Sequence, residues 1–185
     1  MRIIAGEARR TVLRAPRGPR TRPTADRVRE AIFDILGPID PTGEAPRALD
    51  LFAGTGAMGL EAVSRGAALA VLVDRDPACV SLCRDNAARA RLADRVRVRA
   101  GDVRQVLGLL ERDGERFDWV FCDPPYSTRD LVETLERLGA GRVLAAGAVV
   151  VAEHSPRNRP DPRYGLLQIS DRRRWGDNEA SFYRA

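Results

Sequence analysis

Residues 50–61 read D-L-F-A-G-T-G-A-M-G-L-E and join a predicted strand to a predicted helix. Gly54 and Gly56 allow a tight turn and let a ligand approach the backbone closely, and Gly59 permits close packing of helix on strand. The helix N-terminus that follows such a turn is a site for a nucleotide ligand. The segment therefore predicts the first strand–turn–helix unit of an α/β fold that binds a nucleotide or nucleoside.

The residue before this turn narrows the choice of ligand. The spacing satisfies G-x-G-x-x-G, which makes NAD one candidate. Asp50 stands directly before the turn, where its carboxylate would repel a pyrophosphate and attract an ammonium group. This favours S-adenosylmethionine, a cationic nucleoside without phosphate. We expect Asp50, Phe52, Gly54 and Gly56 to bind this cofactor.

Strands and helices alternate along the rest of the chain. Continuous apolar strands separated by helices imply a parallel sheet with both faces covered. Residues 165–170 and 180–183 predict an antiparallel pair that closes the sheet. The expected fold is α/β, a Rossmann-like doubly wound, mainly parallel seven-stranded sheet with an antiparallel C-terminal hairpin. The other predicted strands are 48–52, 69–73, 96–99, 117–122 and 148–152, and the helices among them are 57–64, 77–91, 103–111 and 129–138.

Acidic residues follow successive predicted strands. Asp74 ends the second strand, the usual place for a carboxylate that accepts ribose hydroxyls. Asp76 is predicted to cap the helix that begins at Pro77. Asp102 follows the third strand, where it could accept a hydrogen bond from the adenine amino group. Each acid alone is a weak signal, but with Asp50 the set is fairly specific for S-adenosylmethionine.

Residues 123–126 read D-P-P-Y and follow the apolar run 117–122. Two prolines remove two backbone donors and fix φ, so the Asp123 carboxylate and the Pro124 carbonyl are held outward. Tyr126 adds a flat aromatic face. Such a loop suits a planar heterocycle with an exocyclic amine, although the tetrapeptide alone could also be an ordinary acidic turn.

The composition indicates a single domain of 185 residues without a membrane span or a secretory signal. The three cysteines lack metal-ligand spacing, which predicts a cytoplasmic protein without a metal. Cys79 and Cys83 are four residues apart on a predicted helix and are expected to face the core. His154, Trp175 and Tyr183 are expected to be structural.

The first 29 residues carry nine arginines against Glu7 and Asp26. We expect a mobile basic arm that contacts nucleic-acid phosphates, with a solvated tail as the alternative. Residues 2–6 and 11–13 could form a short hairpin, and a helix is predicted from Thr24 or Asp26 to about Leu36. The chain is thus divided into a basic arm with its helix, residues 1–40, and a catalytic domain, residues 41–185.

These motifs together resemble the class I S-adenosylmethionine-dependent methyltransferases. The chain is similar to the bacterial RsmD family over R-I-I-A-G at 2–6, R-P-T-A-D-R-V-R-E-A-I-F-D-I-L at 22–36, the glycine turn and D-P-P-Y. The segment 22–36 discriminates, because the other motifs are shared widely among methyltransferases. The resemblance implies methylation of N2 of one guanine in 16S ribosomal RNA.

The resemblance also implies the roles of individual residues. Asp50, Gly54, Gly56, Asp74 and Asp102 would surround the cofactor. The target base would meet the loop 123–126, with Asp123, Pro124 and Tyr126 as catalytic residues. The partner would be 16S ribosomal RNA in a partly assembled small subunit, bound by a monomer. The candidate RNA-binding residues are Arg9, Arg10, Arg22, Thr24, Arg27 and Tyr126.

Two other functions stay open at this point. The first is the same chemistry on adenine N6 or cytosine N4 of RNA or DNA, since D-P-P-Y does not distinguish these amines. A separate target-recognition domain would support this function, but we expect 185 residues to be too few to include one. The second is a non-catalytic RNA-binding factor for ribosome assembly. An intact glycine turn with its acids opposes that function, because a pure RNA binder needs neither.

Overall fold

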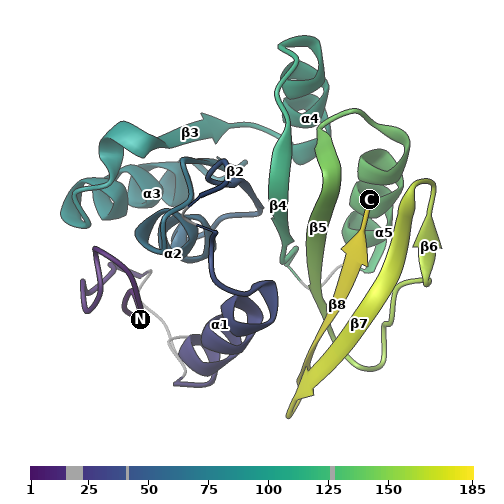
Figure 1. The fold of residues 1–185 in the computed structure, drawn as a ribbon, viewed down its shortest axis with the longest axis horizontal. Coiled ribbons are helices and arrows are strands. Elements are labelled where there is room, and N and C mark those ends of the chain that lie inside the picture. The colour runs from purple at the N-terminus through teal and green to yellow at the C-terminus, as the bar shows by residue number, and fades with distance from the viewer. Residues whose placement is uncertain (16–22, 41, 126–127) are drawn as a thin grey trace.

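The computed structural model describes residues 1–15, 23–40, 42–125 and 128–185, with the backbone alone at residues 23–25 and 128. Figure 1 shows how strands and helices alternate through the chain. The elements are α1 (Pro23–Leu36), β1 (Arg47–Leu51), α2 (Ala57–Ser64), β2 (Leu69–Asp74), α3 (Pro77–Arg89), the 3₁₀ turn η1 (Ala93–Arg95), β3 (Val96–Ala100), α4 (Val103–Arg112), β4 (Phe117–Cys122), α5 (Thr128–Ala140), β5 (Leu144–His154), β6 (Arg163–Tyr164), β7 (Leu167–Trp175) and β8 (Asn178–Arg184).

The strands form one sheet in the order β3-β2-β1-β4-β5-β8-β7-β6. Strands β1 to β5 pair in parallel, and β8, β7 and β6 continue the sheet with antiparallel pairings. This confirms the predicted Rossmann-like fold with an antiparallel C-terminal hairpin. The described sheet has one more strand than expected, because β6 is only two residues long and leaves no apolar run to read.

The strand order reverses between β1 and β4, which is where doubly wound sheets bind ligands at the carboxyl ends of their strands. From β1 the chain moves outward to β3 and then returns to β4 on the other side of β1. The predicted site residues at the ends of β1, β2 and β4 therefore meet at a single edge.

One hydrophobic cluster covers each face of the sheet. On the face that we call the α1 face, helices α1, α2 and α3 pack on the strands, and the cluster there includes Ile32, Leu60 and Phe121. Phe33 of α1 lies 5.5 Å from Phe121, measured between ring centroids. The α4–α5 face is the second cluster, in which α4 and α5 pack on residues such as Leu49. None of the helices in the described part of the chain is both long and apolar enough to cross a bilayer.

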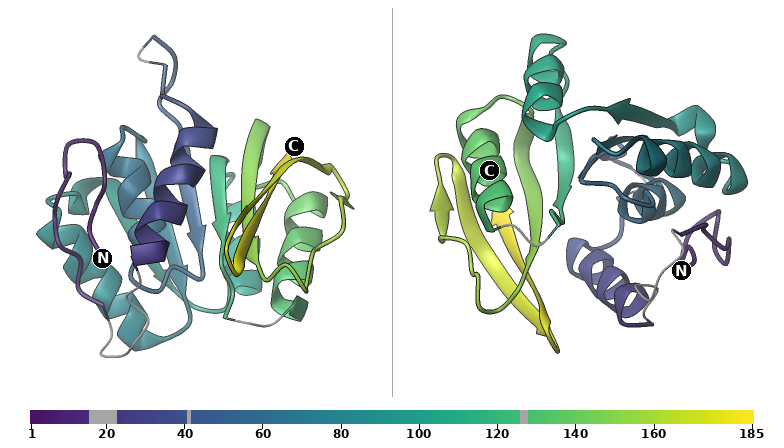
Figure 2. Two further views of the ribbon diagram at one scale, coloured as in Figure 1. Left: turned by 90° about the horizontal axis from the view of Figure 1, so that it is seen from below. Right: turned by 180° about the vertical axis from the view of Figure 1, so that it is seen from behind.

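The N-terminal segment, residues 1–14, packs on the body of the protein. Arg2 and Val12 form an antiparallel bridge, so the predicted hairpin is present in its smallest form. Ile3 and Leu13 are buried in the α1-face cluster. Figures 1 and 2 show α1 lying between this segment and strands β5 and β8. The expectation of a mobile arm is therefore wrong for residues 1–14.

Buried polar groups of α2 hold the N-terminal segment in place. The Glu61 carboxylate, which is 0% exposed, accepts hydrogen bonds from the backbone N–H groups of Ile4 (2.8 Å) and Ala5 (3.0 Å). Gly6 has a φ of +80°, and a Cβ there would lie 1.7 Å from the Ser64 carbonyl oxygen. The R-I-I-A-G motif is thus a docking motif, which arginine content alone could not indicate.

Candidate active site

The turn between β1 and α2 has an unusual backbone. Phe52, Gly54 and Gly56 all have positive φ values, of +64°, +55° and +77°. Glycine adopts this region freely, but a bulky aromatic residue such as Phe52 rarely does, and such strain concentrates at functional sites. Gly56 also lies close beneath Leu72, whose Cδ1 atom would be 2.9 Å from an added Cβ. The turn is therefore a cradle in which backbone groups line the surface.

Asp50 lies beneath this turn and is almost completely buried. Its Oδ2 atom accepts a hydrogen bond of 3.0 Å from the Gly59 N–H, one of the free donors in the first turn of α2. Burial, together with the nearby carboxylates of Asp123 and Asp74, raises the pKa of Asp50 to about 8, although the hydrogen bond from Gly59 acts in the opposite direction. A cationic ligand in the turn would relieve this repulsion, whereas a pyrophosphate would add to it.

Asp74, at the end of β2, connects the turn to the neighbouring strand. One carboxylate oxygen accepts from the Gly54 N–H at 2.8 Å and the other from the Asp76 N–H at 2.9 Å. The Asp76 carboxylate accepts in turn from the Ala78 N–H, which confirms its predicted role as the cap of α3. Asp74 thus fixes the position of Gly54 at the mouth of the turn.

Asp102, at the end of β3, is the N-terminal cap of α4. Its carboxylate accepts from the Arg104 backbone N–H at 3.0 Å and from the Arg104 side chain at 3.1 Å. These hydrogen bonds hold the pKa of Asp102 below its usual range. Capping is therefore the contact that the structure shows for this residue.

The D-P-P residues follow β4 at the same edge of the sheet. Pro124 is buried and Asp123 is exposed. Asp123 raises the pKa of Asp50 and of Glu153, so its carboxylate lies within electrostatic reach of both. Tyr126 lies outside the described residues.

Glu153, at the end of β5, is a site residue that the sequence reading missed. It is half-buried, and burial together with Asp123 and Asp50 raises its pKa to about 8, while Arg29 of α1 acts in the opposite direction. The signal was available, since Glu153 is one more acid directly after a buried apolar strand.

His154 and Tyr183 are held by contacts within the fold. The two ring nitrogens of His154 lie 2.8 Å from Ser181 Oγ and 3.0 Å from the Ser155 carbonyl oxygen, and burial lowers its pKa. The buried Tyr183 donates a hydrogen bond of 2.7 Å to the Asp161 carbonyl. These contacts agree with the expected structural roles.

Cys79 and Cys83 lie in different environments. Cys83 is buried beneath the glycine turn, with its Sγ atom 3.4 Å from the Gly54 carbonyl oxygen, as a core-facing residue should be. Cys79 is partly exposed and lies beside Asp74.

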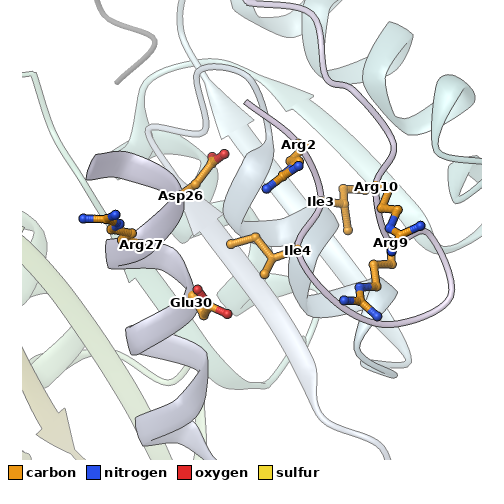
Figure 3. Close-up of a pocket in the computed structure, with 8 residues that line it drawn as sticks. All are labelled: Arg2, Ile3, Ile4, Arg9, Arg10, Asp26, Arg27 and Glu30. Carbon is orange, nitrogen blue, oxygen red and sulfur yellow. The ribbon is translucent and has the colours of Figure 1, made fainter. Parts of the chain in front are cut away.

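A hollow of about 560 Å³ lies between the N-terminal segment and α1. Figure 3 shows its lining residues, with Asp26, Arg27 and Glu30 on α1 and the others on the N-terminal segment. The hollow places two predicted RNA-binding residues, Arg9 and Arg10, near Arg2, which was not predicted, and it is also lined by Arg27, whose side chain is directed away from the N-terminal segment in Figure 3. We call this cavity, which Arg2, Arg9, Arg10 and Arg27 line, the arginine hollow. Arg22 lies outside the described residues, and only the backbone of Thr24 is described, in α1.

Comparisons with known proteins identify the family of this chain. A family model described as "Conserved hypothetical protein 95" matches residues 1–184. YlbH of Bacillus subtilis is 32% identical over 184 residues, which cover 100% of this chain and 98% of that protein. The "Ribosomal RNA small subunit methyltransferase D" of Escherichia coli is 37% identical over 162 residues, 85% of this chain and 76% of that protein. The solved structure of Escherichia coli yhhF has a TM-score of 0.85 and 32% identity, over 100% of this chain and 97% of that one.

Proposed function

Since this chain belongs to the Conserved hypothetical protein 95 family, the RsmD family of RNA methyltransferases, we propose that it methylates N2 of a guanine in 16S ribosomal RNA. The proposal rests on one observation. The glycine turn, the D-P-P loop and the acids Asp50, Asp74 and Asp102 all lie at the same edge of the sheet. Neither a structural turn nor a simple RNA binder requires that combination.

The residues of the turn fit S-adenosylmethionine. A backbone cradle admits close approach of a ligand, and the Asp50 and Asp74 carboxylates favour a cation over a phosphate. We assign cofactor binding to Asp50, Phe52, Gly54, Gly56, Asp74 and Asp102. For Asp102 this requires that the carboxylate accept from adenine beside its capping bonds, which its remaining lone pairs allow.

The chemistry at the base follows from the D-P-P loop. The bound cofactor supplies an electrophilic methyl group on a sulfonium. Asp123 and the Pro124 carbonyl accept hydrogen bonds from the N2 amine, whose lone pair is otherwise delocalised into the guanine ring. These bonds orient the lone pair and stabilise the positive charge that develops on nitrogen as the new N–C bond forms and the S–C bond breaks. S-adenosylhomocysteine leaves, and the methylated nitrogen then loses one proton to Asp123 or to water. Tyr126 would stack on a base turned out of the RNA.

The arginine hollow supplies the sequence-independent part of RNA binding in this proposal. Arg2, Arg9, Arg10 and Arg27 would contact phosphates, which position the RNA without selecting the base. Residues 1–40 then form the RNA-contacting extension and residues 41–185 the methyltransferase domain. We further propose that the substrate is a partly assembled small subunit in the cytoplasm and that the enzyme acts as a monomer.

Methyl transfer with a labelled donor tests the proposal. The wild-type protein is incubated with small-subunit particles, naked 16S RNA and DNA, and the modified nucleoside is identified after digestion. We expect N2-methylguanosine, with most label on particles. Label found only as N6-methyladenosine or N4-methylcytidine would refute the guanine assignment. Absence of transfer to all three substrates, despite cofactor binding, would favour an assembly factor.

A further inference from the structure

Glu153 is the last residue but one of β5, the strand next to the D-P-P loop. Strands β4 and β5 are parallel, and Cys122 pairs with Ala152, so Asp123 and Glu153 are the next residues on adjacent strands. Neighbouring strands lie about 4.8 Å apart. Two carboxyl groups therefore stand side by side where the proposed target base must lie.

Glu153 projects from the α1 face of the sheet. Val151 belongs to the α1-face cluster, whereas Val150 and Ala152 belong to the α4–α5 face. Because side chains alternate along a strand, Glu153 shares the face of Val151. The charged groups that act on it are Asp123 directly after β4, Asp50 from β1 and Arg29 from α1. On its other side β8 presents Ala180, which is small and uncharged.

The acceptor capacity of Glu153 is not used by the fold. Within residues 1–15, 23–40, 42–125 and 128–185, no hydrogen bond to its carboxyl group is found. The nearby Arg29 is directed elsewhere, since it donates to the Arg2 carbonyl at 2.6 Å and to Asp26 at 3.0 Å. By contrast, the buried Glu179 is held by two bonds from Arg159. A half-buried carboxyl group with spare acceptors beside a reaction site indicates a ligand contact.

We propose that the Glu153 carboxylate accepts a hydrogen bond from guanine N1–H while Asp123 and Pro124 accept from the adjacent N2 amine. This inference rests on the proposed function and deepens it. Guanine presents two neighbouring donors on its Watson–Crick edge, the edge that enzymes read on an extruded base. Adenine and cytosine present an acceptor nitrogen beside their amine, which a carboxylate would repel. Glu153 is thus a specificity-determining residue that selects guanine.

The role requires the ionised carboxyl group. Burial and the neighbouring acids raise the pKa of Glu153 to about 8, so the ionised fraction grows as the pH rises toward that value. A cationic methyl donor in the adjacent site favours the same form. The protonated acid would instead donate to a ring acceptor such as adenine N1. Discrimination in favour of guanine is therefore expected to increase with pH.

A guanine analogue combined with variants of Glu153 tests this contact. 2-Aminopurine keeps the exocyclic amine at C2 but lacks O6 and has an unprotonated N1. Small-subunit particles are reconstituted with guanine or 2-aminopurine at the methylated position, and single-turnover rates are measured for wild type, Glu153→Ala and Glu153→Gln. Glu136→Gln, on the exposed surface of α5, is the matched control. Melting temperature and binding of S-adenosylhomocysteine verify that each variant folds.

The proposal predicts that substituting Glu153 slows methyl transfer more when the base carries a proton on N1 than when it does not. Glu153→Ala should slow transfer to guanine roughly 10- to 100-fold and transfer to 2-aminopurine less than about threefold, the scale of one hydrogen bond to a charged group. Glu153→Gln, whose amide can donate, should lower the preference for guanine and lose the rise of kcat/KM between about pH 6.5 and 8 that titration of a raised carboxyl group gives.

Two results would overturn it. Equal losses on both bases, with an unchanged pH profile in Glu153→Gln, would mean that Glu153 acts only through the fold. A wild-type enzyme that methylates adenine or cytosine would refute both this inference and the proposed function. The wild-type product therefore shows which of the two has failed.

Discussion

The two carboxylates that matter most at the residue scale, Asp50 and Asp123, sit in opposite environments. Asp50 is buried beneath the glycine turn, whereas Asp123 is exposed at the edge where a base can approach. The first is suited to a fixed electrostatic role toward the cofactor, and the second to contact with the substrate. Substitutions at the two positions should therefore affect different measurements.

Asp123→Ala should retain the fold and the affinity for S-adenosylmethionine but slow methyl transfer. The expected loss is on the order of 10²- to 10³-fold, the scale of one electrostatic contact made in the transition state. Single-turnover kinetics with saturating cofactor measure it. Rates within about threefold of wild type, below the effect of a single such contact, would identify Asp123 as only a turn residue.

Asp50 should make the free protein less stable as the pH rises from 6.5 to 8. Its folded pKa is about 8, so in this window the folded state holds a proton that the unfolded state, with an ordinary carboxyl pKa, has lost. The free energy of unfolding then falls with pH, by at most about 1.4 kcal/mol per pH unit for each such group. Glu153 contributes in the same direction. His154, whose pKa is lowered by burial, acts in the opposite direction at the low end of this window.

Urea unfolding at several pH values tests this assignment. Asp50→Asn keeps an acceptor for the Gly59 N–H but cannot ionise, so it should reduce the slope. An identical slope in this variant would show that Asp50 is ionised throughout the window.

At the element scale, the central strands and their acids could be predicted while the N-terminal segment could not. Continuous apolar runs and glycine spacing are local signals, and Ala57–Ser64 and Phe117–Cys122 have the predicted bounds. The docking of residues 1–14 depends on Glu61, which reads in the sequence as an ordinary helix acid. Its role arises only when α2 is brought against Ile4 and Ala5 by the fold.

Glu61→Ala should release the N-terminal segment. It removes the acceptor of two backbone N–H groups and of Arg65, and the charge 3.5 Å from the buried Arg29 Nε. Breaking a buried ion pair by removing one partner costs about 3–5 kcal/mol. We expect a lower melting temperature and faster hydrogen exchange at the amides of Ile4 and Ala5. Glu136→Ala, on exposed surface, is the control. Unchanged protection of those two amides would contradict the docking role.

At the scale of the whole molecule, positive charge is concentrated at one end of the chain. The first 29 residues have a balance of +7 and the whole chain +5, so the remaining residues carry −2. The fold places part of this charge in the arginine hollow, beside α1. Figures 1 and 2 show α1, which borders this hollow, lying between the N-terminal segment and strands β5 and β8.

The double variant Arg9→Gln/Arg10→Gln should weaken RNA binding without changing cofactor affinity. Both residues are exposed, and the backbone that docks residues 1–14 does not depend on their side chains. If each contacts a phosphate, the slope of log K against log salt becomes shallower by roughly 0.7–0.9 per lost contact. Arg116→Gln is the control, because Arg116 lies before β4, at the opposite edge of the sheet from Asp123.

Substitution tests RNA binding better than truncation, because residues 1–14 pack on the body of the protein. Deleting residues 1–14 would leave Glu61 buried without its backbone donors, so a loss of RNA binding could reflect unfolding. In the double variant the fold is kept, and phosphate contacts carry no base preference. Affinity for particles should therefore fall while the methylated nucleotide stays the same. A salt slope equal to that of wild type would mean that RNA docks elsewhere, and a changed target nucleotide would mean that the hollow helps to select the base.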